Sequence, residues 1–335
     1  MNPKILILSL SYCALLLFCF PTIIFAKPYY EGKTITIVSG SQPGGGYDRV
    51  ARLFAKYLPN YIPGRPSIII ANKPGAASII SANEVYNIAK PDGLTIGSPQ
   101  RGIPYAQLLH VEGVKFDVTK FAWIGSMAAE STILGIRSDL PYKTFEDLRK
   151  AKSQLVFGDT GMGASSAQFV ILLKEFLGIN LRMIFYPASP EVMLAVERKE
   201  VDGKAGSYSS LKPYIERGLV RPLIRGRTSE PGIENLPVDE DVATDKKYKT
   251  IMAMRSAAEL ISRPFVAPPG TPDKVISILR DAFARAAKDP QLREDAKKNM
   301  MLVDYTSAKE CLRIVNFVLN QPKDVVQEFS KYVQF

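Results

Sequence analysis

Residues 34 to 58 read TITIVSGSQPGGGYDRVARLFAKYL, and this stretch decides the fold class. A β-branched run, TITIVSG (34 to 40), leads into three consecutive glycines, and an apolar pattern of helical period follows them. The pattern repeats at i, i+3, i+4, i+7 and i+8, through Val50, Leu53, Phe54, Tyr57 and Leu58. Strand, glycine loop and helix in this order begin an α/β unit, whose loop can hold an anion at the helix N-terminus.

The same order recurs along the chain. SIIIA (67 to 71) and LTIGS (94 to 98) are apolar at consecutive positions, which predicts strands buried on both faces. LVFGDTGMGASSAQFVILLKEF (155 to 176) repeats the apolar run, the glycine loop and the helix, and VRPLIRG (220 to 226) predicts one more strand. Strands that alternate with helices throughout predict an α/β fold with parallel sheets and crossover helices.

Helix start signals divide the second half of the chain. Thr144 and Asp147 form a capping-box pattern. Two further helices are expected where a hydroxyl N-cap precedes a proline at the first helical position, at Ser189-Pro190 and Thr271-Pro272. Residues 228 to 262 are rich in charge and predict a long connection with some helix, while 290 to 299 and 307 to 332 predict helices.

The first residues, MNPKILILSLSYCALLLFCFPTIIFA, have the layout of a secretory signal peptide with cleavage near Ala26. The alternative is an uncleaved membrane anchor, because the apolar run approaches the roughly 20 residues that span a bilayer. Removal of residues 1 to 26 from the 335 leaves 309 residues, for which two domains are expected. Only Cys311 then remains, so the mature chain is expected to have no internal disulfide.

The chain has a formal charge of +10, and loss of Lys4 lowers it to +9. The basic residues are scattered, with DKKYK (245 to 249) the densest group, which favours a solvated basic surface over a nucleic-acid site. Such a surface can raise the encounter rate with small anions.

The glycine loop does not match the nucleotide-binding motifs. Gly44 and Gly46 fit a dinucleotide fingerprint, but Arg49 stands where its third glycine belongs. A Walker loop needs Lys and then Ser or Thr after its last glycine, and here Gly46 and Tyr47 follow. We therefore expect no nucleotide and no other cofactor.

Catalytic and metal motifs are also lacking in the sequence. His110 is the only histidine and no Gly-x-Ser-x-Gly elbow occurs, which argues against a Ser-His-Asp triad and against a histidine-based metal site. Cys311 lies in an apolar helical pattern, which favours a buried structural thiol. We predict a chain without catalytic residues or metal ligands, and hence not an enzyme.

Four loops at predicted helix starts share glycine or alanine with hydroxyl residues: SQPGGGYD (41 to 48), NKPGAAS (72 to 78), GDTGMGASS (158 to 166) and AGSYSS (205 to 210). Each offers unpaired backbone N–H groups at the positive end of a helix dipole. For one loop alone, ordinary turn and capping chemistry is sufficient. Four such loops on one α/β scaffold favour a shared anion site that binds a small carboxylate reversibly.

Three segments then resemble a known family: PGGGYDRVARLFAKYL (43 to 58), ANKPGAASIISANEVYNIAKPDGLTIGS (71 to 98) and VAPPGTPDKVISILRDAFARAAKDPQLRE (266 to 294). They look like the extracytoplasmic solute receptors of tripartite tricarboxylate transporters, the Bug-type or TctC-like proteins. The resemblance implies a periplasmic binding protein of type II with a mixed β-sheet flanked by helices in each lobe. Lobe 1 would comprise 27–125 plus 255–335, and lobe 2 would comprise 126–254.

The resemblance also implies which residues contact the ligand in the cleft. The first loop would contribute Gln42, Pro43, Gly44, Gly45, Gly46 and Tyr47, and the second Gly75, Ala76, Ala77 and Ser78. The second lobe would contribute Thr160, Gly161, Ser165 and Ser166. Asp48 is shared with the family and is interpreted first as a helix N-terminal charge, with direct ligand contact as the alternative.

The chain departs from the family pattern where ligand identity is selected. IFYPASPEV replaces the usual Val-Pro-Tyr-Lys-Gly segment, and AGSYSS occupies the region in which an acidic residue often follows the Gly-x-Val-Asp strand. Ser207, Tyr208 and Ser209 therefore become candidates for the pocket. The identity of the carboxylate does not transfer from the family.

The leading hypothesis is a monomeric periplasmic receptor that delivers a small organic carboxylate to the membrane subunits of a transporter. One alternative is a ligand-sensing module for a sensor kinase ectodomain, and a second is an exported enzyme on the same fold. The cleft is expected to close by hinge motion near residues 120 to 130 and 250 to 265.

Overall fold

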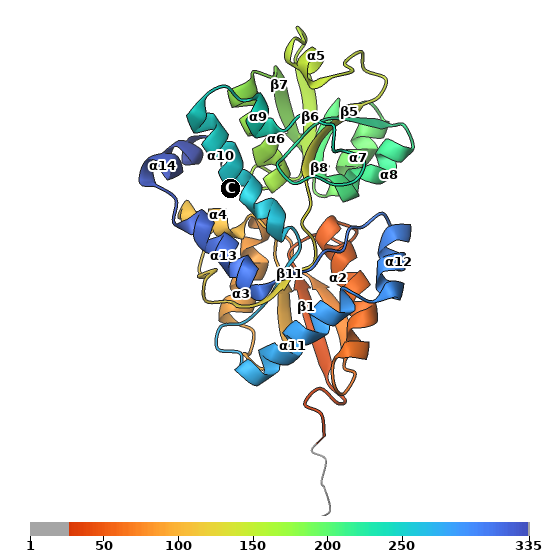
Figure 1. Ribbon diagram of the computed structural model, residues 1–335, viewed down its shortest axis with the longest axis vertical. Helices are drawn as coiled ribbons and strands as arrows, with labels where there is room; N and C mark the ends of the chain where they lie inside the picture. The colour runs from red at the N-terminus through yellow and green to blue at the C-terminus, as the bar shows by residue number, and fades with distance from the viewer. Residues whose placement is uncertain (1–26, 334–335) are drawn as a thin grey trace, which may run out of the picture.

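The computed structural model describes residues 27–333, and the expected signal peptide over residues 1–26 lies outside them. The chain forms two lobes, each built on its own β-sheet, with helix α10 running from the upper lobe toward the centre (Figure 1). In this part of the chain, no helix is both long enough and apolar enough to cross a bilayer. Two mixed sheets, each flanked by helices, confirm the fold class that the family resemblance implies. The parallel sheets predicted from the alternation alone were wrong, because strands β10, β11, β5 and β9 pair antiparallel with their neighbours.

The first sheet has six strands in the order β11-β4-β10-β3-β1-β2. Strand β1 pairs in parallel with β2 and β3, whereas β10 runs antiparallel to β3 and β4, and β11 antiparallel to β4. The strands are β1 (Thr34–Ser39), β2 (Ser67–Asn72), β3 (Thr95–Ser98), β4 (Ala122–Ser126), β10 (Pro264–Ala267) and β11 (Thr306–Ser307). The return of the chain through β10 completes this lobe.

The second sheet has five strands in the order β7-β6-β8-β5-β9. Strand β6 is parallel to β7 and β8, and β5 is antiparallel to β8 and β9. The strands are β5 (Thr132–Arg137), β6 (Leu155–Asp159), β7 (Leu181–Phe185), β8 (Gly203–Ser207) and β9 (Val220–Arg225). This sheet is therefore built entirely from the middle of the chain.

Helices flank both sheets. The first lobe has α2 (Gly46–Tyr57), α3 (Ile79–Asn87), α4 (Ile103–Leu108), α11 (Asp273–Ala286), α12 (Pro290–Lys298) and the 3-10 turns η1 (Leu58–Tyr61) and η2 (Ala76–Ser78). The middle of the chain adds α5 (Phe145–Arg149), α6 (Ser165–Leu177), α7 (Ser189–Glu197), α8 (Tyr208–Glu216), α9 (Asp239–Val242), α10 (Lys246–Ala257) and η3 (Ala258–Ile261). Helices α13 (Ala308–Leu319) and α14 (Lys323–Tyr332) end the chain.

The opening unit folds as its pattern predicts. Val50, Leu53, Phe54 and Tyr57 are buried on one face of α2. Phe54 lies 5.7 Å from Phe283 of α11 and 6.2 Å from Phe265 of β10, measured between ring centroids. These aromatic contacts fix α2 against the first sheet and so fix the glycine loop at its N-terminus.

Some local predictions were wrong. Strand β2 is at the edge of its sheet, so it is not buried on both faces, and Ile69 is 54% exposed. The capping box at Thr144 is confirmed, but Ala188 is the N-cap of α7, one residue before Ser189. Thr271 does not cap α11, because its hydroxyl donates to the Pro268 carbonyl at 2.8 Å and Pro272 takes the cap position.

Two crossings join the lobes, residues 127–131 and 258–263, and they lie side by side. Their backbones are hydrogen bonded from Met127 N to Arg263 O at 2.9 Å and from Ser262 N to Ala128 O at 3.0 Å. The second crossing falls within the range expected for the hinge, and the first extends one residue beyond its range. The hinge motion itself stays a prediction.

The C-terminal helix α14 contacts α6 and α10, on the second lobe, although residues 255–335 were expected in lobe 1. Phe176 of α6 stacks on Tyr248 of α10 at 4.0 Å between centroids and meets Tyr332 of α14 edge-on at 4.8 Å. An ion pair of 2.5 Å joins Lys247 to Glu328. Helix α13 contacts β4 and α4 of the first lobe, so α13 and α14 together run along one side of both lobes (Figure 1).

Candidate functional site

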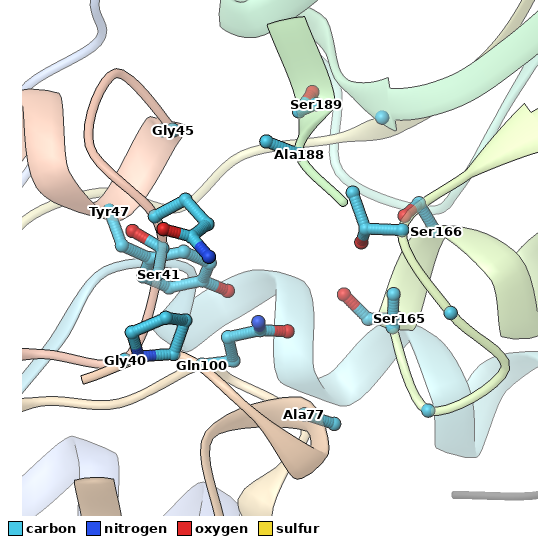
Figure 2. Close-up of a pocket in the computed structure, with 18 of the residues that line it drawn as sticks. Gly40, Ser41, Gly45, Tyr47, Ala77, Gln100, Ser165, Ser166, Ala188 and Ser189 are labelled. Atoms are coloured by element: carbon cyan, nitrogen blue, oxygen red, sulfur yellow. The ribbon is translucent and has the colours of Figure 1, made fainter. Parts of the chain in front are cut away.

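A cavity of about 450 Å³ lies between the lobes, and residues of all four glycine- or alanine-bearing loops line it. Figure 2 shows Ser41, Gly45 and Tyr47 of the first lobe facing Ser165, Ser166 and Ser189 of the second across open space. The volume is in the range of pockets that hold small molecules.

Most of the residues predicted from sequence line this cavity. They are Gln42, Gly45, Gly46, Tyr47, Gly75, Ala76, Ala77, Thr160, Gly161, Ser165, Ser166 and Ser207. Pro43, Gly44, Ser78 and Tyr208 are not among the lining residues. Ser209 is also absent from the lining, where its neighbour Ser210 is present. Contact of any of these residues with a ligand stays a prediction.

Some residues outside the lining hold the loops in place. Asp48 is 1% exposed, and its carboxylate accepts from Gly44 N at 2.8 Å, Arg52 at 2.9 Å and Asn72 at 2.9 Å. Burial opposes the charge of Asp48, but these hydrogen bonds outweigh it and lower the pKa of the carboxyl below its ordinary value. Asp48 thus acts on the first loop from within the protein.

The second loop is strained. Ala76, Ala77 and Ser78 adopt φ values of 43°, 48° and 76°, in the left-handed region that costs energy for residues other than glycine. The Ser78 hydroxyl donates to the Gly40 carbonyl at 2.8 Å, which joins the second loop to the first. This conformation leaves the N–H groups of Ala76 and Ala77 without an acceptor among residues 27–333.

Helix N-termini provide further donors. The N–H groups of Gly46 and Tyr47 in α2, and of Ser165 and Ser166 in α6, begin helices and have no acceptor within the described chain. Because the positive ends of both helix dipoles face the same cavity, it favours an anion.

Sequence reasoning missed three basic side chains in the lining: Arg101, Lys204 and Arg263. Arg101 follows β3 and is 3% exposed. Its guanidinium donates to Ser165 at 3.2 Å, to Ser262 at 2.8 Å and to Thr132 at 2.6 Å, all neutral hydroxyl oxygens. Arg101 therefore connects the first lobe, the crossing and the second lobe.

Arg263 lies on the return crossing, next to β10. Its Nη2 forms an ion pair of 2.5 Å with Glu130 Oε2 and donates to Ser207 at 3.1 Å. The guanidinium carbon lies 4.8 Å from the centroid of the Tyr47 ring, in a cation–π contact. Glu130, only 1% exposed, also accepts from the Ser209 hydroxyl, which explains why Ser209 faces away from the cavity.

Lys204 lies on β8 of the second lobe and is 5% exposed. Burial lowers the pKa of its ammonium, and the nearby Asp159 carboxylate partly opposes this effect. Burial also raises the pKa of Asp159. Lys204 could have been found from sequence, because a charge inside the apolar and small run GKAGS is out of place in a buried strand.

The lining suits binding rather than covalent chemistry. Neither His110 nor Cys311 is part of it, and burial raises the pKa of the Cys311 thiol to about 12, which keeps it unreactive. Across residues 27–333, no group of three His, Cys, Asp or Glu side chains is placed to hold a metal ion. The lining therefore offers hydrogen-bond donors and positive charge.

Comparisons with known proteins agree with this geometry. The sequence profile of the tripartite tricarboxylate transporter family receptor matches residues 50–330. A UPF0065 protein of Bordetella pertussis is 27% identical over 307 residues, which cover 90% of this chain and 91% of the relative. The structure of the periplasmic binding protein BugD is 22% identical with a TM-score of 0.72, covering 90% of this chain and 97% of that one.

Two structures from Rhodopseudomonas palustris have the same fold. MatC with bound malate is 18% identical with a TM-score of 0.68, covering 94% of this chain and 100% of that one. Rpa4515 with adipate is 20% identical with a TM-score of 0.72, covering 91% of this chain and 99% of that one. The profile matches most of the sequence and the resemblance is confirmed: this chain belongs to the tripartite tricarboxylate transporter receptor family, a family of solute-binding receptors and not of enzymes.

Proposed function

We propose that this chain is a periplasmic receptor that captures a small organic carboxylate in the cavity between its lobes. The observation that carries the proposal is the composition of the lining. Unpaired N–H groups at the starts of α2 and α6 and three basic side chains, Arg101, Lys204 and Arg263, face one space of about 450 Å³. Of these three, only Arg263 has a carboxylate within ion-pair distance among the described residues, so a bound anion would supply the negative charge that the other two lack in direct contact.

The ligands of two structural relatives support a carboxylate. MatC holds malate and Rpa4515 holds adipate, both small acids. The first lobe would bind one carboxylate through the N–H groups of Gly46, Tyr47, Ala76 and Ala77. The second lobe would contact the remainder through Thr160, Ser165, Ser166 and Ser207.

We also propose that the chain delivers this ligand to the membrane subunits of a tripartite transporter, which the description of the matching family supports. We further propose that residues 1–26 direct export and are removed near Ala26. Mass measurement of the protein isolated from the periplasm tests the cleavage, since an uncleaved N-terminus would contradict it.

Thermal unfolding of the mature chain tests the binding function. The panel comprises mono-, di- and tricarboxylates, acidic amino acids and aromatic acids, with the neutral amides of the same acids as controls. A ligand at about 100 times its dissociation constant stabilises the folded state by roughly 2.7 kcal/mol. The proposal predicts stabilisation by at least one acid and not by its amide, and absence of any effect from every acid contradicts it.

A further inference from the structure

Lys204 is the only charged residue of strand β8, which lies between β5 and β6 in the second sheet. All five residues of the strand are buried, and Lys204 and Gly206 both line the cavity. A lysine ammonium in such a position has lost most of its hydration, which costs free energy unless a negative charge replaces the water.

The protein does not supply that charge by direct contact. Within residues 27–333, no carboxylate lies within 4.0 Å of the Lys204 ammonium. The acid that acts on it most, Asp159, is outside the lining, and its Oδ1 accepts from Thr160 N at 2.7 Å and from the Ser166 hydroxyl at 3.0 Å. Oδ1 of Asp159 is thus engaged by the glycine loop of its own lobe. Its buried Oδ2 has no hydrogen-bond partner among the described residues, and the carboxylate acts on Lys204 only from beyond ion-pair distance.

The other two cations of the lining, Arg101 and Arg263, have hydrogen-bond or ion-pair partners within the protein. Arg263 is paired with Glu130 at 2.5 Å, and Arg101 donates to hydroxyl and carbonyl oxygens at the lobe junction. Lys204 alone has no hydrogen bond to another described residue and stands on the second lobe, opposite the first-lobe loops. Lys204 is therefore the cation of the lining that is free to pair with a ligand held by those loops.

The following inference rests on the proposed function. We propose that Lys204 determines specificity by pairing with a second acidic group of the ligand, so that the receptor selects dianions over monoanions. The first-lobe loops bind one carboxylate by backbone N–H groups, which carry no preference for what lies at the other end. Lys204 selects the group at that other end, because an uncharged group there would leave the buried ammonium without a counter-charge in direct contact.

Calorimetric titration with matched ligands tests the role of Lys204. The probes are succinate and adipate, each compared with its monoamide, which keeps the length and one carboxylate. Wild-type protein is expected to bind a diacid about 10- to 100-fold more tightly than its monoamide, the ratio typical of a hydrogen bond between charged groups. In Lys204→Met the diacid should fall to the affinity of the monoamide, while the monoamide itself changes little.

Two further variants control for folding and for net charge. Lys212→Met removes a lysine from the outer surface of the same lobe and should leave both affinities unchanged. Should Lys204→Met unfold, the double variant with Asp159→Asn removes the carboxylate that the lysine leaves behind, while its amide oxygen still accepts from Thr160 and Ser166.

The outcomes separate this inference from the proposed function. Equal binding of diacid and monoamide to wild type overturns the role of Lys204, and so does an equal loss of both ligands in Lys204→Met, which indicates a structural residue. Binding of monocarboxylates without any diacid overturns the selection of dianions and leaves the receptor function standing. Absence of binding by every acid overturns both.

Discussion

Replacement of Arg263 by methionine tests the ion pair that joins the crossings to the cavity. Arg263 is 4% exposed and Glu130 is 1% exposed, and their side chains approach to 2.5 Å. Methionine keeps an apolar stem against the Tyr47 ring but leaves the Glu130 carboxylate buried without its cation. Removal of one partner of a buried pair costs about 3–5 kcal/mol, which is the loss expected for Arg263→Met.

A second substitution should return most of this stability. Glu130→Gln in the Arg263→Met background removes the uncompensated charge, and the amide oxygen still accepts from the Ser209 hydroxyl. Replacing both members of a buried ion pair by uncharged residues often changes the free energy of unfolding little. The double variant is therefore expected within about 1–2 kcal/mol of wild type. Its ligand affinity should stay reduced, because the cavity has lost a cation.

Urea unfolding measures these changes in unfolding free energy, provided that the dependence of the free energy on urea concentration is the same in every variant. Arg285→Met is a matched control, since Arg285 forms an exposed ion pair with Asp281 on α11 and should change stability by less than about 0.5 kcal/mol. A loss below about 1 kcal/mol in Arg263→Met would refute the reasoning. So would a double variant as unstable as the single one.

Three other changes probe the loops and the crossing. Gly45→Val should abolish ligand binding and leave the fold largely intact. The backbone of Gly45 (φ −69°) suits valine, its Cβ would lie 3.1 Å from the Gln42 carbonyl oxygen so that only the loop has to shift, and the side chain blocks the approach of a ligand to the first loop; unchanged affinity in calorimetry would contradict this. Gly40→Ala should cost about 2–4 kcal/mol in urea unfolding, since its Cβ would lie 2.0 Å from Ser78 Oγ and break the hydrogen bond between the loops; an unchanged midpoint is the contrary result. Burial raises the pKa of Glu230 to about 7, so the folded state holds this proton more tightly than the unfolded state, and stability falls as pH rises from about 4.5 to about 7. In Glu230→Gln, the decrease in unfolding free energy between about pH 4.5 and about pH 7, on the order of 3 kcal/mol, should disappear, while the Ser131 N–H keeps an acceptor. Identical profiles of stability against pH for the two proteins would exclude the effect.

Local pattern was enough for the opening unit and the glycine loops. The helical period of α2 follows from side chains three and four residues apart, and the glycines follow from the need for a close backbone approach. Residues of all four loops line one cavity, as the prediction of a shared site requires. The edge position of β2 could not be predicted, because strand order depends on contacts between distant segments.

The basic residues of the lining illustrate the same limit. Arg101 and Arg263 are 162 residues apart and come together only because β10 returns antiparallel beside β3 and β4. Each looks in the sequence like an ordinary surface arginine near a strand end. Lys204 differs, since its place within a buried strand was visible as a local conflict between charge and burial.

The central claim is that the interlobe cavity binds the carboxylate form of a small organic acid. Calorimetric titration of the mature protein with that acid and with its fully amidated analogue tests it most directly. The account predicts one-to-one binding of the acid and no measurable binding of the neutral analogue. Equal affinity for both, or no heat of binding from any small acid, would contradict it.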